Sequence, residues 1–140
     1  MYPALRTLAA ILLGMVVAFV LVVAVELFSA VVHPFPDDFG GTKEEVCRHV
    51  EHYPPWVLAV VVAAWVLTAF VATWTAQKMG NVLSFAIVSL LLLAALAFNI
   101  WQLPYPTWFK IVNLLVIPAA IAAGGRLSTR NKAPGIGESK

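Results

Sequence analysis

The chain has 140 residues, of which 61% are hydrophobic and only 11% are charged, and its net charge is +2. Soluble domains are about half apolar and about a quarter charged, so this composition excludes an ordinary soluble globular protein. The small net charge offers no basic surface for nucleic acid, and the length leaves room for one domain.

Long uncharged stretches predict an all-α membrane protein, a bundle of four transmembrane helices. Crossing hydrocarbon takes about 20 apolar residues. The predicted spans are 8–32, 56–76, 82–100 and 108–123. Lys110 lies near the start of the last span, where its ammonium can extend outward while its stem stays in lipid. We expect residues 1–127 to form the transmembrane domain, and the polar residues 128–140 to form a disordered cytoplasmic tail.

Basic residues are unevenly distributed between the two sides of this topology. Positive residues favour the cytoplasmic side of a membrane, so the richer side is expected to be cytoplasmic. We therefore expect both termini in the cytoplasm of a multi-pass protein of the cell membrane, specifically the bacterial inner membrane. The richer side has Arg6, Lys78, Arg126, Arg130, Lys132 and Lys140, and the other side has Lys43, Arg48 and Lys110.

The first connection, residues 33–54, is predicted to contain a short extracytoplasmic helix over 43–52. Each proline in the sequence His33-Pro34-Phe35-Pro36 disfavours helix in the residue before it, so this segment is expected to be extended. Thr42 stands three residues before Glu45, which is the spacing of a capping box. Tyr53-Pro54-Pro55 should end the helix.

Small residues recur at every fourth position of the second span, and others gather late in the fourth. Membrane helices associate through close packing because lipid is as apolar as their side chains. We therefore expect these rows to be helix-packing ridges without a chemical role. They consist of Ala64, Thr68, Ala72 and Ala76, and of Ala119, Ala120, Ala123 and Gly124.

Glu26 is the one charged residue inside the first three spans. An ionisable residue at membrane depth is costly, so it marks a functional site or requires a partner. Ser29 and His33 follow one and two turns later on nearly the same side of the helix. Asn99 and Asn113 reach the same level from the third and fourth spans. We predict an intramembrane polar cluster of these five residues near the non-cytoplasmic face.

Two interpretations of this cluster compete. In the structural one, Glu26 is protonated or hydrogen-bonded to Asn99 or Asn113 and holds the helices in register. In the other, Glu26 titrates during transport and His33 relays protons to the outer solvent. The sequence shows no second acid in the cytoplasmic half that would complete a proton path, which favours the structural interpretation.

The outer loop offers a candidate metal site. Glu45, His49 and His52 recur at i, i+4 and i+7 of the predicted short helix, and Cys47 lies between them. Imidazole, thiolate and carboxylate groups are ligands for zinc or copper. Cys-x-His-x-x-His is not a standard ligand motif, so we predict no cofactor and keep a metal as an alternative. Cys47 has no partner cysteine in the chain and is expected to be a free thiol.

Nearly the whole chain resembles small uncharacterised multi-pass proteins of bacterial inner membranes. The shared features are an acid late in the first span, the exit His33-Pro34-Phe35-Pro36, a short outer helix and a proline-aromatic segment before the last span. This resemblance implies an architecture and no activity. Four spans with a glutamate in the first are also similar to small multidrug-resistance transporters. In this chain the acid lies later, the first connection is longer and aromatic residues around the acid are sparse.

These observations predict a non-enzymatic structural or accessory subunit of the bilayer, associated with itself or with a larger membrane complex. One alternative is a proton-linked small-molecule transporter in which Glu26 is the coupling acid. Another is an outward-facing metal-binding module built on His49 and His52. The sequence contains no phosphate-binding loop, nucleophile elbow or catalytic dyad, so no enzymatic activity is predicted.

Overall fold

The computed structural model describes residues 2–130, which form five helices and no strand. Four of the helices are long and apolar enough to cross a membrane, and the prediction of an all-α four-helix membrane bundle is confirmed. In chain order the helices are α1 (Pro3–Val32), α2 (Lys43–Glu51), α3 (Pro55–Met79), α4 (Val82–Gln102) and α5 (Thr107–Arg130).

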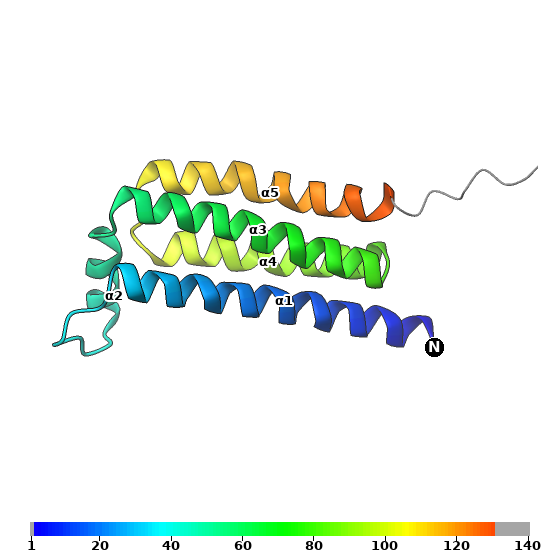
Figure 1. The fold of residues 1–140 in the computed structure, drawn as a ribbon, viewed down its shortest axis with the longest axis horizontal. Coiled ribbons are helices and arrows are strands. Elements are labelled where there is room, and N and C mark those ends of the chain that lie inside the picture. Colours follow the sequence, from blue (N-terminus) through cyan, green and yellow to red (C-terminus); the bar gives the residue numbers. More distant parts are fainter. Residues whose placement is uncertain (1, 131–140) are drawn as a thin grey trace, which may run out of the picture.

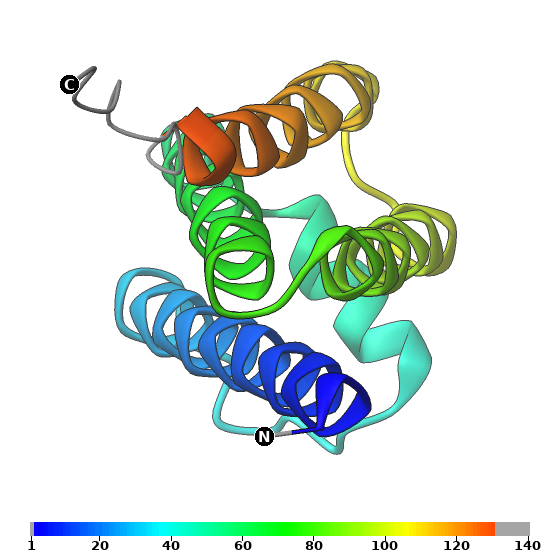
Figure 2. The same ribbon diagram turned by 90° about the vertical axis from the view of Figure 1, so that its right-hand side faces the viewer.

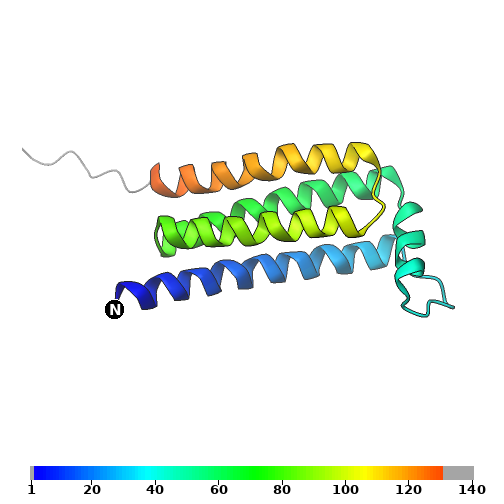
Figure 3. The same ribbon diagram turned by 180° about the vertical axis from the view of Figure 1, so that it is seen from behind.

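The four long helices lie side by side and alternate in direction, and the short helix α2 lies across one end of them (Figures 1 and 3). We call this the α2 end, and it also holds the connection between α4 and α5. The opposite end, called the terminal end, holds the start of α1, the turn between α3 and α4, and the end of α5. Short connections force such neighbours to be antiparallel.

Helix α3 is the centre of the bundle. It packs mainly against α5 and α1 and less extensively against α4, whereas α1 and α5 do not contact each other (Figure 2). The predicted ridge on the second span forms part of these contacts, because Thr68, Ala72 and Ala76 are buried. Small side chains on several sides of α3 allow neighbouring helices to approach closely, as expected for packing in lipid.

Three helices approach one another closely in the terminal half of the bundle. A Cβ atom added to Gly14 of α1 would lie 3.1 Å from the Ala72 carbonyl oxygen and 3.1 Å from the Ala76 Cβ. It would also lie 3.3 Å from Val88 Cγ2 of α4. A residue without a side chain therefore fits best at position 14, because α1, α3 and α4 meet at this point.

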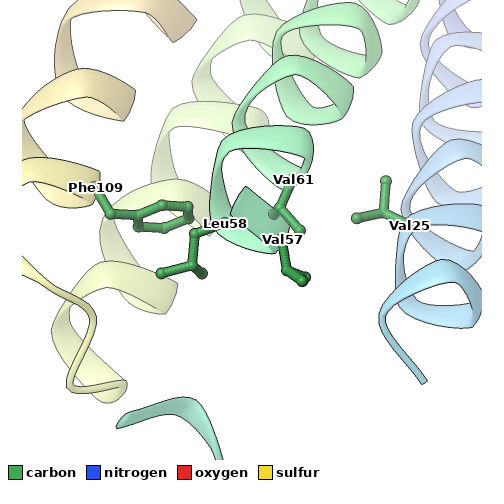
Figure 4. Close-up of a cluster of buried hydrophobic side chains, with 5 residues drawn as sticks. All are labelled: Val25, Val57, Leu58, Val61 and Phe109. Atoms are coloured by element: carbon green, nitrogen blue, oxygen red, sulfur yellow. The ribbon is translucent and has the colours of Figure 1, made fainter. Parts of the chain in front are cut away.

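The α2 end is filled by larger side chains (Figure 4). Val25 of α1 and Phe109 of α5 pack on opposite sides of α3, against Val57, Leu58 and Val61. The Phe109 ring is fully buried and stacks on the Tyr105 ring with centroids 4.5 Å apart.

Helix α5 is longer than predicted. The expected span ended at residue 123 and a disordered tail was expected from residue 128, but α5 continues to Arg130. Ser128 is fully buried, and its hydroxyl donates a hydrogen bond to the Gly125 carbonyl at 2.7 Å. Gly124 and Gly125 therefore allow close packing instead of ending the helix. Residues 131–140 of the predicted tail lie outside the described residues.

The predicted capping box at the start of α2 is confirmed. The Glu45 backbone N–H donates to Thr42 Oγ1 at 3.3 Å, and the Glu45 carboxylate accepts the backbone N–H groups of Thr42 and Gly40 at 3.0 Å each. This reciprocal bonding satisfies donors that the helix start leaves free. Lys43 also donates from Nζ to Gln102 Oε1 at 2.9 Å and so connects α2 to the end of α4.

Candidate functional site

A cavity of about 160 Å³ lies between α1, α3 and α4, with Ile117 of α5 also in its wall, and it is lined by two of the predicted polar residues. Glu26 belongs to the last two turns of α1 and Asn99 to the last turn of α4, so both lie toward the α2 end. The rest of the wall includes Trp65 and Thr68 of α3. The remaining lining is apolar, which makes the carboxyl and the amide the principal polar groups of the site.

The cavity opens on the surface of the bundle between α1 and α4. Three of its wall residues on these two helices are exposed, namely Glu26, Ala95 and the 38% exposed Val22. Its wall residues on α3 and α5 are covered, because Thr68 and Ile117 are each 4% exposed. In a membrane this opening faces lipid or another membrane component.

Glu26 has no hydrogen bond or ion pair with any residue in the range 2–130. The neighbouring Asn99 Oδ1 is buried and also has no partner. The predicted hydrogen bond between Glu26 and an amide is therefore not formed, although Glu26 and Asn99 share one cavity. Unsatisfied polar groups are rare and costly at membrane depth, so these two groups require an explanation.

Asn113 does not belong to this site. It is fully buried, and its Nδ2 donates to the Phe109 carbonyl of its own helix at 2.9 Å. It does not line the cavity, and α3 separates α5 from α1. The sequence placed Asn113 at the right level, but the rotation of α5 about its own axis is set by packing against α3. The predicted five-residue cluster is therefore smaller in the structure.

His33 and Ser29 belong to a second group of side chains at the α2 end. His33 caps the end of α1, and its ring stacks on the His49 ring with centroids 4.4 Å apart. His49 also stacks on Phe35 at 4.1 Å, so it lies between two rings and is only 8% exposed. Nε2 of both histidines is buried without a partner. We call His33, His49 and Phe35 the ring stack.

Tyr53 connects the ring stack to α1. Its ring lies 4.7 Å from His33, centroid to centroid. Burial raises the pKa of the Tyr53 phenol, and the Ser29 side chain beside it opposes that shift. Ser29 itself is 5% exposed. The phenol stays neutral at physiological pH, so the hydroxyl remains available as a hydrogen-bond donor beside the end of α1.

The predicted metal ligands are not arranged as a site. Within residues 2–130, no group of three or more histidine, cysteine, aspartate and glutamate side chains is placed to hold a metal ion. The Glu45 carboxylate is committed to the capping box, where its hydrogen bonds with Thr42 hold its pKa below the ordinary value. His52 Nδ1 lies 2.6 Å from the Arg48 carbonyl, and Cys47 is a half-buried free thiol.

Sequence reasoning missed the aromatic residues of the site. Trp65 lines the cavity and makes edge contacts with Phe109 at 5.6 Å and Tyr105 at 6.4 Å between ring centroids. Aromatic residues seemed sparse near the acid because only its own helix was considered. Trp65 lies one turn before Thr68, which belongs to the predicted packing ridge. This position was the one signal in the sequence that Trp65 faces the neighbouring helices.

No protein-family model, curated protein or solved structure matches this chain. Function therefore has to be inferred from the chemistry of the cavity and of the ring stack.

The ring stack should loosen on acidification. Burial lowers the pKa of His49, and the nearby His33 lowers it further. The unfolded imidazole takes up its proton near pH 6.5, whereas the stacked one does so only at lower pH. The stabilisation is therefore complete above about pH 6.5 and is lost as the pH falls below it. The protection factors of the α2 amides, which compare the observed exchange rate with the intrinsic rate at each pH, should fall between pH 7.5 and pH 5.5.

The two stacked histidines line a hollow that also contains other charged or titratable side chains, so controls are required. These side chains are Asp38, Glu45, Arg48 and His52. His49→Phe keeps an aromatic ring between its neighbours and should abolish the pH dependence. His52→Gln removes an exposed imidazole whose charge makes the smallest contribution to the lowered pKa of His49, so the pH dependence should persist. An equal fall in the α2 protection factors of the His49→Phe protein would contradict the assignment to His49.

Proposed function

We propose that this protein is a non-enzymatic accessory subunit of a larger membrane assembly, which it joins through the opening between α1 and α4. The observation that carries the proposal is Glu26, which lies inside a membrane-spanning helix, is exposed at the bundle surface and has no partner in residues 2–130. Ionisable groups at membrane depth pair with something, so a second component is expected to supply the partner.

The close packing of the terminal half supports a binding role over a conduit. Gly14, Ala72, Ala76 and Val88 bring α1, α3 and α4 into contact on the terminal side of the cavity. The basic residues favour a cytoplasmic position for that end, and we place the protein in the bacterial inner membrane with both termini cytoplasmic. The cavity would then lie in the half of the membrane remote from the cytoplasm.

Site-specific photo-cross-linking tests the accessory role. A photoreactive residue at Leu91, one turn from Ala95 on α4, should give a protein adduct of one defined mass in cells, and Glu26→Gln should abolish it. The matched control is Leu115 of α5, which is 68% exposed and should give lipid adducts alone. A Leu91 adduct that persists in Glu26→Gln, or the absence of any protein adduct, would refute the proposal.

A second candidate function is proton-linked transport of a small molecule. The observation that favours it is the cavity itself, since Glu26, Asn99 and Trp65 surround a space of about 160 Å³. Glu26 would be the coupling acid. Uptake in proteoliposomes separates this function from the accessory role. If Glu26 is the coupling acid, a pH gradient should drive uptake by the wild type and not by Glu26→Gln, and unchanged uptake would exclude this coupling role.

A further inference from the structure

The cavity between α1 and α4 presents acceptors and an aromatic ring to whatever enters it. Glu26 contributes a carboxyl group, Asn99 contributes an oxygen without a partner, and Trp65 contributes its indole. None of the described residues that line the cavity is basic. The neutralising group for Glu26 is therefore absent from the cavity wall.

These three groups together select a cation. A carboxylate pairs with an ammonium or guanidinium group through charge-assisted hydrogen bonds. An amide oxygen accepts a further N–H donor, and the indole is the most favourable ring for a cation–π contact. An anion would be repelled by Glu26, and an apolar group would leave both acceptors unpaired at membrane depth.

The size and direction of the cavity restrict how the cation arrives. A cavity of about 150 Å³ is large enough for benzene, so the observed 160 Å³ admits one side chain or one small molecule. A whole helix, about 10 Å across, does not fit. The opening lies on the bundle surface that lipid surrounds, and a free cation is costly in hydrocarbon. A cation attached to a membrane-spanning helix avoids that cost.

The rim of the opening suits such a helix. Ala95 is small and exposed at the edge of the cavity, which permits a close approach of a neighbouring backbone. Leu91 and Phe98 of α4 are 44% and 64% exposed beside it and offer apolar contacts. A helix packed along this rim would direct a side chain into the cavity at the level of Glu26.

We infer that a lysine or arginine side chain from a membrane-spanning helix of a different protein occupies the cavity and pairs with Glu26 and Asn99 beside the Trp65 ring. This inference rests on the proposed accessory role and specifies the chemistry of the partner. It requires one basic residue in that helix, located at the depth of Glu26, toward the α2 end of the bundle.

Synthetic single-span peptides test the inference directly. A leucine-alanine peptide with one lysine at the depth of Glu26 is mixed with the full-length protein in bicelles, and binding is followed by energy transfer from a dye on Cys47. We expect about tenfold tighter binding than for the same peptide with norleucine. A peptide with its lysine moved to the other end of the span should bind no better than the norleucine peptide.

Variants of the cavity provide the decisive comparison. Glu26→Gln keeps the size of the side chain and should remove the preference for lysine, whereas Asn113→Leu lies outside the cavity and should retain it. Glu26→Lys should instead prefer a peptide with glutamate at the same depth. Circular dichroism establishes that each variant keeps its helices. Equal binding of the lysine and norleucine peptides to the wild type would overturn the inference.

Other occupants give different results. Glu26-dependent binding of butylammonium without a preference for the lysine peptide would identify a small free cation and overturn the inference. Self-association that requires both Glu26 and Lys110 would identify a second copy of the chain and also overturn it. A Glu26-dependent adduct at Leu91, found together with no lysine preference, would retain the accessory role and refute only the basic side chain.

Discussion

Phe109→Ala should lower the free energy of unfolding by about 3–5 kcal/mol, which is the range for truncating a fully buried phenylalanine. The ring fills the space between α3 and α5 at the α2 end, against Leu58 (Figure 4). It also contacts the Tyr105 and Trp65 rings. Its removal leaves a cavity that the surrounding helices cannot close completely. Unfolding in mixed detergent micelles, followed by circular dichroism, measures the loss.

The neighbouring Trp108 is the matched control for this variant. It is also aromatic but is 40% exposed, so Trp108→Ala should cost clearly less than Phe109→Ala. Losses of equal size would show that the aromatic belt at this end acts through the interface with lipid and not through packing between α3 and α5.

Gly124→Ala should be less stable than Gly125→Ala by about 2 kcal/mol, because only the first methyl group collides with backbone. A Cβ on Gly124 would lie 2.5 Å from Thr73 Oγ1 and 2.7 Å from the Phe70 carbonyl oxygen of α3. A Cβ on Gly125 would approach the far edge of the Phe85 ring, at 2.8 Å from Cε2, and a side chain can turn away.

The comparison of these adjacent variants removes the effect of helix propensity. Replacing glycine by alanine favours an α-helix by about 1 kcal/mol at either position, so the difference in unfolding free energy isolates the collision with α3. The same micelle unfolding assay applies. If Gly125→Ala proved the more damaging of the two, α5 would pack on α3 through a different face from the one described.

The fold could be predicted from the sequence because its main determinants are local. Four apolar stretches of sufficient length predicted the four spanning helices, and Thr42 with Glu45 predicted the start of α2. The predicted end of the fourth span was too early, because the polar residues from 128 onward were expected to form a disordered tail. Ser128 is nevertheless fully buried, and the composition of this segment alone does not reveal its packing.

The site could be predicted only in part. Depth along a helix follows from residue number, and this placed Glu26 and Asn99 correctly at one level. Rotation about the helix axis does not follow from residue number, so Asn113 was assigned to the polar cluster with Glu26, although it is buried on α5 and does not line the cavity. The pairing of His33 with His49 depends on the path of the loop between α1 and α2, which single-residue preferences do not determine.

The absence of any contact between α1 and α5 constrains how the protein is made. A nascent chain leaves the ribosome from its N-terminus, so α1 enters the bilayer first and waits there without a partner until α3 follows. Helix α5 likewise finds its main docking surface on α3 and contacts α4 less extensively. Shortened chains that stop before residue 55, where α3 begins, should therefore leave α1 unassembled, and quality-control proteases would meet it with Glu26 still facing lipid.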